Sequence, residues 1–288
     1  MSLRTLAETL RVKHYCKNAF VLLPLFFSFK FLQPIALART ALAFAAFCCT
    51  ASAVYIFNDL WDRERDAQHP IKKDRPIPSG RVSLPLAVTL MVVLAVAACG
   101  AALYLSVSCL LVVAAYLLLN VAYSIRLKSI PIIDVAIIAA GFILRVLMGS
   151  LAINAPMSHW LLLTIIAVSF YLGFGKRANE LKRVGAEANT REVLFKYSER
   201  FLHQAMTVMM TLAIMMYALW TIDPAVTARF GEYLVYTTAL IVLLVLRYAY
   251  ILDGKDAHGD PVTTLLSDKP ILIGGALYVV ILLLMAFL

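Results

Sequence analysis

The sequence predicts an all-α integral membrane protein built as a bundle of nine transmembrane helices. Of its 288 residues, 62% are apolar and only 15% are charged, and the mean hydropathy is +0.85. A soluble globule of this composition would lack the polar residues needed to cover its surface. Apolar stretches close to the roughly 20 residues that cross hydrocarbon recur along the whole chain, and Lys and Arg residues gather in alternate connections between them.

The first apolar stretch spans 18–34 and follows four basic residues, an arrangement that also begins a signal peptide. Its end, Leu32-Gln33-Pro34, offers no small-residue cleavage pattern, so we expect a retained helix. The remaining apolar stretches are 38–60, 84–106, 108–124, 130–152, 157–174, 203–222, 230–252 and 270–288.

Two polar connections, 58–83 and 175–202, are longer than the others and follow the second and sixth helices. Function is therefore expected there, because binding and catalytic groups concentrate in connecting segments. Their equivalent positions suggest two related four-helix halves, about 18–124 and 130–252, followed by a last helix at 270–288. We expect one transmembrane catalytic domain over 1–288.

The net charge of +9 has a topological explanation, since 22 of the 26 Lys and Arg residues fall on one side of the predicted membrane topology. By the positive-inside rule the N-terminus is cytoplasmic, and the protein is a multi-pass protein of the inner (plasma) membrane with its active site facing the cytoplasm. No nucleic-acid partner is expected. Any lipid-facing surface could carry a homo-oligomer, so the oligomeric state stays open.

The five cysteines and five histidines show no metal-type spacing, so neither a disulfide framework nor a histidine metal site is expected. The most informative motif is the acidic run 58–66, which continues the second apolar helix as it leaves the membrane. Helical steps of three and four residues place Asn58, Asp59, Asp62 and Asp66 on one oxygen-rich stripe.

Such a stripe of like charges is unfavourable by itself, and more so near hydrocarbon. A divalent cation reverses this, and magnesium prefers one or two carboxylates together with substrate phosphates. The sequence therefore predicts Mg²⁺ on Asp59, Asp62 and Asp66. The alternative is that these acids neutralise neighbouring cations in an ordinary solvated loop.

The run resembles the first motif of the UbiA superfamily of intramembrane prenyltransferases, Asn-Asp-x-x-Asp-x-x-x-Asp, at all four defined positions. Lys72-x-x-Arg75-Pro76 and Gly80 resemble the loop that follows in that superfamily. The resemblance covers essentially the whole chain and implies a nine-helix bundle that binds a diphosphate substrate through magnesium.

A second aspartate-rich motif, usual in that superfamily, is replaced here by Gly175-Lys176-Arg177-Ala178-Asn179-Glu180-Leu181-Lys182-Arg183. This half-site is mainly cationic, which suits a substrate set with more phosphate than one metal ion neutralises. Lys176 is expected to act in catalysis beside the three aspartates. Residues expected to bind substrate are Lys17, Asn18, Asn58, Lys72, Arg75, Tyr123, Lys128, Arg177, Glu180 and Arg247.

For each lone cation the alternative is a topology determinant or a lipid-headgroup contact. Arg145 lies within an apolar helix, so it should face the bundle interior and pair there, with either a structural or a substrate role.

The Gly-Lys-Arg-x-x-Glu-Leu run resembles the polyprenyl-phosphate (decaprenyl-phosphate) phosphoribosyltransferase branch of the superfamily. Lys17-Asn18, Ala53-Val54-Tyr55, Leu127-Lys128, Leu246-Arg247-Tyr248 and Asp253-Gly254 also match that branch. The run 11–15 lacks the branch's Pro and Trp, so the resemblance assigns no role to Arg11 or Tyr15.

The resemblance implies a magnesium-dependent transfer of 5-phosphoribose from phosphoribosyl pyrophosphate (PRPP) to a polyprenyl phosphate, in precursor synthesis for the cell envelope. Two other functions stay open. One is a prenyltransferase that uses a prenyl diphosphate and an aromatic acceptor, which the basic second motif disfavours. The other is a lipid or solute transporter, which the clustering of charges at one face disfavours.

Overall fold

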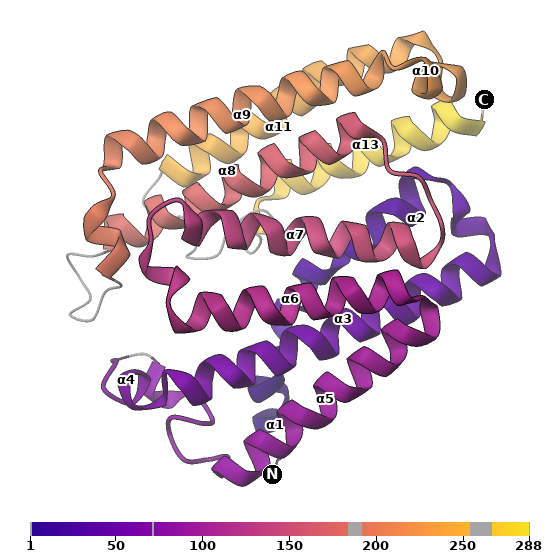
Figure 1. Ribbon diagram of the computed structural model, residues 1–288. Coiled ribbons are helices and arrows are strands. Elements are labelled where there is room, and N and C mark those ends of the chain that lie inside the picture. Colours follow the sequence, from indigo (N-terminus) through magenta and orange to yellow (C-terminus); the bar gives the residue numbers. More distant parts are fainter. Residues whose placement is uncertain (1, 71, 184–191, 254–266, 288) are drawn as a thin grey trace. The chain divides into compact units, whose positions relative to one another are not determined.

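The computed structural model describes residues 2–70, 72–183, 192–253 and 267–287, and every regular element in these ranges is a helix (Figure 1). The chain divides into two compact units, Met1–Pro156 and Met157–Leu288. Each unit is described by itself below.

The first unit begins with a segment of short helices rather than one long helix. It comprises α1 (Leu3–Leu10), the 3-10 helix η1 (Val12–Leu22), α2 (Leu23–Phe27) and the 3-10 helix η2 (Lys30–Leu32). The predicted helix at 18–34 is therefore not continuous. Pro24 has no backbone N–H to extend the η1 turns into α2, and Phe29 adopts a left-handed conformation with φ 56°.

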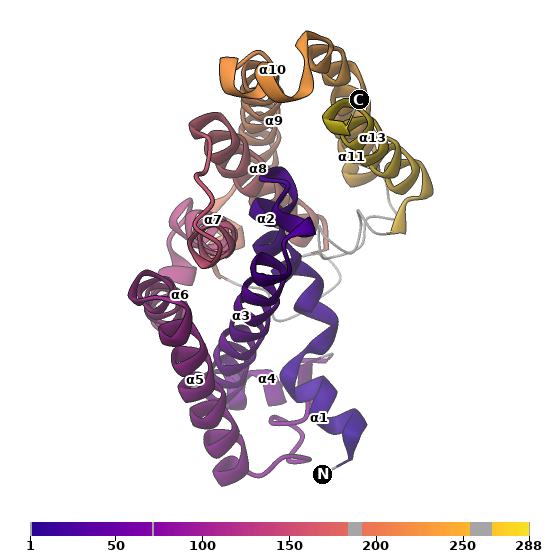
Figure 2. The ribbon, with the colours of Figure 1, turned by 90° about the vertical axis from the view of Figure 1, so that its right-hand side faces the viewer.

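Long helices make up the rest of the first unit: α3 (Pro34–Trp61), α5 (Leu84–Leu105), α6 (Val107–Ile125) and α7 (Ile133–Ala152). α3 is its centre, since α5, α6, α7 and η1 all contact it, and Figure 2 shows α3 between α5 and the N-terminal segment. Short helices connect these elements, namely α4 (Arg63–Ala67) and the 3-10 helices η3 (Lys72–Asp74) and η4 (Leu127–Ser129).

Small residues along α3, α5 and α7 allow these helices to approach closely, as is usual between helices in membranes. Ala43, Ala98 and Ala152 are buried in one apolar cluster around Phe47. At the end of this bundle opposite the acidic run, Arg39 donates to the carbonyl oxygens of Ala152, at 2.5 Å, and Leu105, at 2.9 Å. It thereby caps the last turns of α7 and α5.

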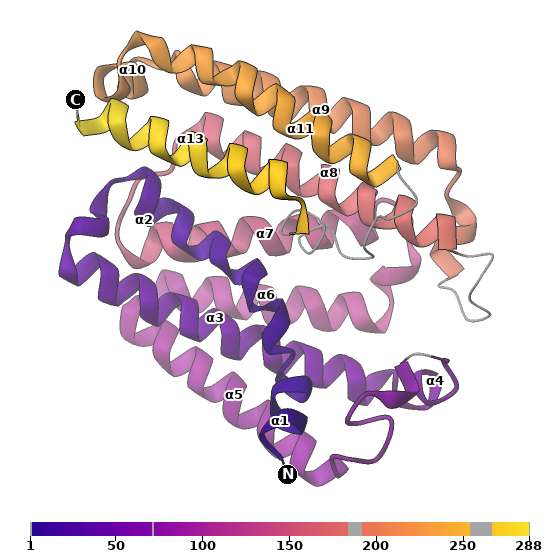
Figure 3. The ribbon, with the colours of Figure 1, turned by 180° about the vertical axis from the view of Figure 1, so that it is seen from behind.

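The second unit contains α8 (His159–Arg183), α9 (Glu199–Thr221), α10 (Pro224–Phe230), α11 (Thr237–Asp253) and α13 (Lys269–Phe287). Two 3-10 helices, η5 (Glu192–Lys196) and η6 (Glu232–Tyr236), connect them. Within this unit α9 packs against α8 and α11, and α13 lies beside α11 (Figure 3). α8 extends to Arg183, so the basic motif is helical and continues a membrane helix.

Within the described ranges, eight helices are long and apolar enough to cross a membrane: 34–61, 84–105, 107–125, 133–152, 159–182, 199–221, 232–252 and 269–286. Their bounds agree within a few residues with eight of the nine predicted stretches, apart from longer starts for the second and seventh and a longer end for the sixth. The chain is therefore a multi-pass membrane protein. A ninth crossing by the broken segment 18–34 stays a prediction, as do the related halves and the cytoplasmic N-terminus.

Candidate active site

The acidic run lies where α3 ends. Trp61 is the last residue of this helix, and Asp62, with φ −93° and ψ 12°, joins it to α4. The backbone N–H of Asp66 still donates to the Asp62 carbonyl, at 2.8 Å. The run is therefore a kinked continuation of α3, and its side chains do not keep the register of one straight helix.

Two carboxylates of the run are buried and face the same cation. Asp59 and Asp66 are 3% and 5% exposed, and Nη1 of Arg75 donates to both, at 3.1 Å and 2.8 Å. Arg11 donates to the same oxygen of Asp59, at 2.5 Å, and the ammonium of Lys72 lies 3.7 Å from Asp66. Three cations from two segments, the end of α1 and the η3 connection, thus converge on two aspartates.

Burial lowers the pKa of the Arg75 guanidinium, and the nearby charge of Arg11 lowers it further, whereas Asp59 and Asp66 oppose both effects. An arginine remains charged at neutral pH even so. The two carboxylates therefore stay in contact with positive charge in a partly desolvated setting, where such contacts are stronger than in water.

Asp62 and Asn58, the other two residues of the predicted stripe, contact η4 and α6. Both carboxylate oxygens of Asp62 accept from Lys128 of η4, at 2.8 Å each, and the Asn58 side chain accepts from Ser124 near the end of α6. Tyr123 lies next to Ser124 and is half-buried. The prediction of one four-residue stripe is therefore wrong in detail, because α3 ends one residue before Asp62.

Asp59 and Asp66 fit a divalent cation chemically, since they offer hard oxygen ligands that already converge on one positively charged group. Asp62 would join them only by leaving Lys128. In the part of the chain that is described, no three His, Cys, Asp or Glu side chains gather closely enough to hold a metal ion. Magnesium on Asp59, Asp62 and Asp66 stays a prediction.

Lys17 and Asn18 lie in η1. Asn18 is 1% exposed, and its amide donates to the sulfur of Cys48, at 3.2 Å, while its oxygen accepts from Arg145, at 2.8 Å. Lys17 is half-buried beside it. In this arrangement Asn18 holds the N-terminal segment on α3 and α7, and its expected substrate contact is untested.

Arg145 faces the interior of the first unit, as predicted, but its partners are neutral. It also donates to the carbonyl oxygen of Gly141, at 2.8 Å, and to the Tyr116 hydroxyl, at 3.0 Å. Its guanidinium carbon lies 5.2 Å from the centre of the Phe47 ring and 5.1 Å from that of Tyr116. Hydrogen bonds and cation–π contacts thus stabilise a buried charge that has no acidic partner among the described residues.

In the second unit, one acid of the basic motif pairs with one of its own cations. Arg177 is fully buried and pairs with Glu180, one helical turn later. Lys176 is half-buried, Asn179 is 3% exposed, and the Arg183 side chain lies outside the described residues. Lys182 of the same motif is exposed, and a contact of Lys176 with a ligand stays a prediction.

Arg247 of α11 pairs with Asp268, which precedes α13, with Nη2 2.9 Å from the carboxylate. Asp268 also accepts from the backbone N–H of Ile271, at 3.0 Å, and the hydrogen bond from Arg247 lowers the pKa of this carboxyl. Arg247 thus ties α11 to the start of α13, and its expected contact with substrate stays a prediction. Gly254, which matched the branch, lies outside the described residues.

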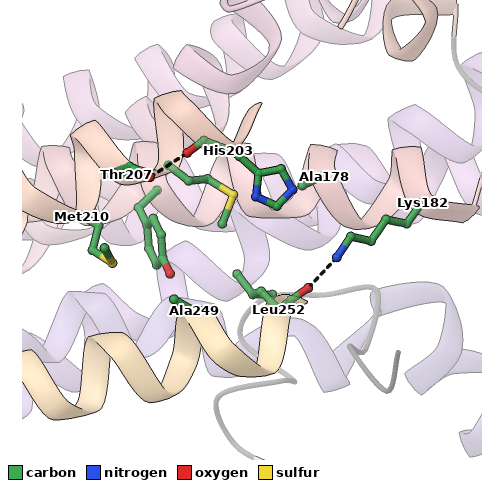
Figure 4. Close-up of a pocket in the computed structure, with 9 residues that line it drawn as sticks. Ala178, Lys182, His203, Thr207, Met210, Ala249 and Leu252 are labelled. Atoms are coloured by element: carbon green, nitrogen blue, oxygen red, sulfur yellow. Dashed lines mark hydrogen bonds between the residues drawn. The ribbon is translucent and has the colours of Figure 1, made fainter. Parts of the chain in front are cut away.

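A pocket in the second unit lies between α8, α9 and α11, lined by Lys182, His203, Met210, Ala249 and other residues (Figure 4). Its walls are mostly apolar, and the ammonium of Lys182 donates to the Leu252 carbonyl, at 3.3 Å. None of the predicted site residues lines it. Lys182 belongs to the basic motif 175–183, and this pocket supports no prediction about phosphate binding.

Sequence reasoning left two contacts of the acidic run unassigned, those of Arg11 and Ser124. Each is remote in sequence from the aspartate or asparagine it binds, and no spacing rule relates the two positions. The basic residues of 4–17 were visible as a group, and only the fold shows which of them reaches Asp59.

The chain matches the sequence pattern of the UbiA prenyltransferase family over residues 20–267. It is 32% identical over 242 residues to the decaprenyl-phosphate phosphoribosyltransferase of Mycolicibacterium smegmatis, covering 81% of this chain and 75% of that protein. It is 33% identical over 236 residues to the protein of the same name in Mycobacterium tuberculosis, covering 81% and 76%.

Among solved structures, a UbiA homolog from Archaeoglobus fulgidus bound to DMAPP and Mg²⁺ aligns with a TM-score of 0.71 and 15% identity. The alignment covers 97% of this chain and 98% of that one. At this identity the likeness shows a shared fold.

Proposed function

The chain belongs to the UbiA prenyltransferase family, and we propose that it transfers 5-phosphoribose from PRPP to a polyprenyl phosphate in the membrane. The products are polyprenyl-phosphoryl-5-phosphoribose and pyrophosphate. The observation that carries this proposal is the identity of about one third, over most of the chain, to proteins named decaprenyl-phosphate phosphoribosyltransferase. The replacement of an aspartate-rich second motif by Lys176-Arg177 supports the same choice.

In the proposed reaction an oxygen of the lipid phosphate attacks the anomeric carbon of the ribose. A new C–O bond forms, and the bond to pyrophosphate breaks with its electron pair on the departing oxygen. A phosphate monoester has its second pKa near about 6 and is ionised at neutral pH. The acceptor therefore needs no strong general base, and we assign none.

The chain's contribution is positioning and charge. Asp59 and Asp66 would hold magnesium, with Asp62 as the third ligand, and the bound ion would neutralise the departing pyrophosphate. Arg75 contacts both of these carboxylates and Lys72 contacts Asp66, and both cations can turn their donors to phosphate oxygens. Lys128 beside Asp62 and Lys176 in α8 are the further cations proposed to orient the two phosphate groups.

The cytoplasmic face is the proposed location of this site, because PRPP is water-soluble and cations cluster in the connections on that side. The polyprenyl tail would lie against the apolar helix surfaces and stay in the bilayer after transfer. The product would accordingly remain in the inner (plasma) membrane.

The test supplies purified protein with Mg²⁺, a polyprenyl phosphate and PRPP carrying ³²P in the 5-phosphate or in the pyrophosphate. We expect lipid-extractable label only from the 5-phosphate, and none when EDTA removes the metal. A prenyltransferase would instead modify an aromatic acceptor with a prenyl diphosphate, and a transporter would change neither substrate. Absence of labelled lipid with every prenyl length would refute the proposal.

A further inference from the structure

A pocket of about 700 Å³ opens in the first unit, between α1 and the connection that follows η3. Its charged lining includes Arg4, Glu8, Arg11, Lys13, Arg75 and Arg81. Pockets that bind small ligands commonly have volumes of about 300–1,000 Å³, so this one can admit a sugar phosphate.

The lining carries a clear excess of positive charge. Five Lys and Arg side chains face two carboxylates, Glu8 and Asp74. Glu8 is already engaged by Arg81, at 2.8 Å, and by Arg4, at 3.0 Å, and these hydrogen bonds lower its pKa. Arg11 also pairs with Asp59, Arg75 with Asp59 and Asp66, and Lys72 with Asp66, so six cations face four acids in all. Positive charge still exceeds negative charge by two, and an anion would balance it.

The cations are also positioned before any ligand arrives. Arg81 donates to the Asp74 carbonyl oxygen, at 2.5 Å, and to the Ser79 hydroxyl, at 3.2 Å, which fixes its guanidinium at the rim. Arg11 lies 4.8 Å above the centre of the Tyr55 ring. Arginine held in this way loses little freedom on binding and matches phosphate oxygens with its fork of donors.

The pocket deepens toward the carboxylates of the candidate active site. Side-chain exposure falls from 44% at Arg81 through 33% at Arg75 to 20% at Arg11. Arg11 and Arg75 each contact Asp59, so they belong both to the pocket and to the candidate magnesium site. A ligand with two separate phosphate groups could occupy both places at once.

We propose that this pocket binds the 5-phosphate of the ribose donor, while the donor's pyrophosphate lies at Asp59 and Asp66. The inference rests on the proposed function and adds α1 and Arg81 to its donor site. The chemistry recognised is a phosphate monoester dianion, which a lipid headgroup also carries, and the test distinguishes the two sources.

Binding is measured first without turnover. Protein in zwitterionic nanodiscs is titrated with ribose 5-phosphate by calorimetry. A lost charge-assisted hydrogen bond corresponds to roughly 10-fold in affinity, and we expect about that weakening for Arg81→Gln. Lys13→Gln should also weaken binding. Lys13 forms no ion pair in the described part of the chain, so weaker binding in this variant cannot be attributed to a broken ion pair, as it could in Arg81→Gln.

Glu8→Gln should have the opposite effect on affinity. It removes negative charge from the pocket lining and should tighten binding of ribose 5-phosphate. A purely structural role for this cluster would predict weaker binding in all three variants. Arg200→Gln removes an exposed charge from α9 and serves as the matched control, with wild-type affinity expected.

Kinetics then identify the source of the phosphate. Arg81→Gln should raise the KM for PRPP by about the same roughly 10-fold and leave the KM for polyprenyl phosphate unchanged. An effect on the lipid KM alone would assign the pocket to the acceptor and overturn the inference. Wild-type ribose 5-phosphate affinity in both Arg81→Gln and Lys13→Gln would also overturn it, whereas an inactive wild type would count against the proposed function.

Discussion

At the scale of single residues, the three aspartates of the acidic run have different surroundings. Asp59 and Asp66 are buried against Arg11 and Arg75, whereas the Asp62 side chain is 30% exposed and pairs with Lys128. Loss of a buried carboxylate leaves buried cations without a counter-charge and should destabilise the protein. A substitution of Asp62 is therefore the one that best distinguishes an effect on catalysis from an effect on stability.

Asp62→Ala is expected to abolish transfer to the lipid while the melting temperature in detergent stays near that of the wild type. Its carboxylate is the proposed third ligand of the metal, and its pair with Lys128 is partly exposed and contributes little to stability. Glu64→Gln removes an exposed acid of α4 and is the control. A wild-type rate for Asp62→Ala would remove this residue from the site.

Arg145 provides a stability prediction at the same scale. Arg145→Met would leave the Asn18 oxygen and the Tyr116 hydroxyl without their buried donor, and we expect a loss of about 2 kcal/mol or more in unfolding free energy. Thermal unfolding in detergent measures this, with Arg200→Met as the exposed control. Equal melting temperatures for Arg145→Met and wild type would show that this network is not stabilising.

The sequence identified the acidic residues but not their partners. Asp59, Asp62 and Asp66 were recognisable because their spacing is local and chemically unusual. The contacts of Arg11 with Asp59 and of Ser124 with Asn58 join residues 48 and 66 positions apart. They depend on how α1 and α6 pack on α3, which no local pattern specifies.

At the scale of elements, hydropathy located eight helices with nearly correct bounds, because an apolar stretch of sufficient length has few alternatives to a helix in a bilayer. It failed at 18–34, where the chain forms two 3-10 helices and one short α-helix. One tertiary contact in this segment is close: the Val21 carbonyl group lies directly against α7 at Gly149. A tight tertiary contact of this kind leaves no trace in hydropathy.

Gly149→Ala tests this packing. An added Cβ would lie 2.0 Å from the Val21 oxygen, so α7 and η1 would have to separate, and we expect destabilisation by about 3 kcal/mol. Gly100→Ala in α5 meets nothing within 4 Å and should be neutral or stabilising by up to about 1 kcal/mol. If both variants melt alike, the close approach of η1 to α7 is refuted.

At the scale of the whole molecule, the charge asymmetry is the strongest global feature of the sequence. It predicts that the N-terminus and the 58–83 segment face the cytoplasm and that the α9–α11 connection faces the other side. The all-helical fold is that of the UbiA family. The orientation in the membrane is a prediction from charge.

A cysteine-labelling experiment checks the orientation. In a background with the five native cysteines replaced, Ala228→Cys should react with a membrane-impermeant maleimide in intact cells. Gln68→Cys should react only after the membrane is permeabilised. Both positions are exposed, so accessibility of the side chain is not limiting, and the reverse pattern would place the candidate site on the wrong side for a cytoplasmic donor.

We propose that the carboxylates at the end of α3 hold a divalent ion together with the donor's pyrophosphate. Mn²⁺ can replace Mg²⁺ as a spectroscopic probe, and electron paramagnetic resonance of the purified protein with saturating PRPP counts the bound ion. We expect a bound Mn²⁺ in the wild type and in Glu64→Gln, and its loss in Asp59→Asn and Asp62→Asn. A wild-type protein that holds no Mn²⁺ with saturating PRPP, or aspartate variants that bind Mn²⁺ as tightly as the wild type, would refute a metal site at these carboxylates.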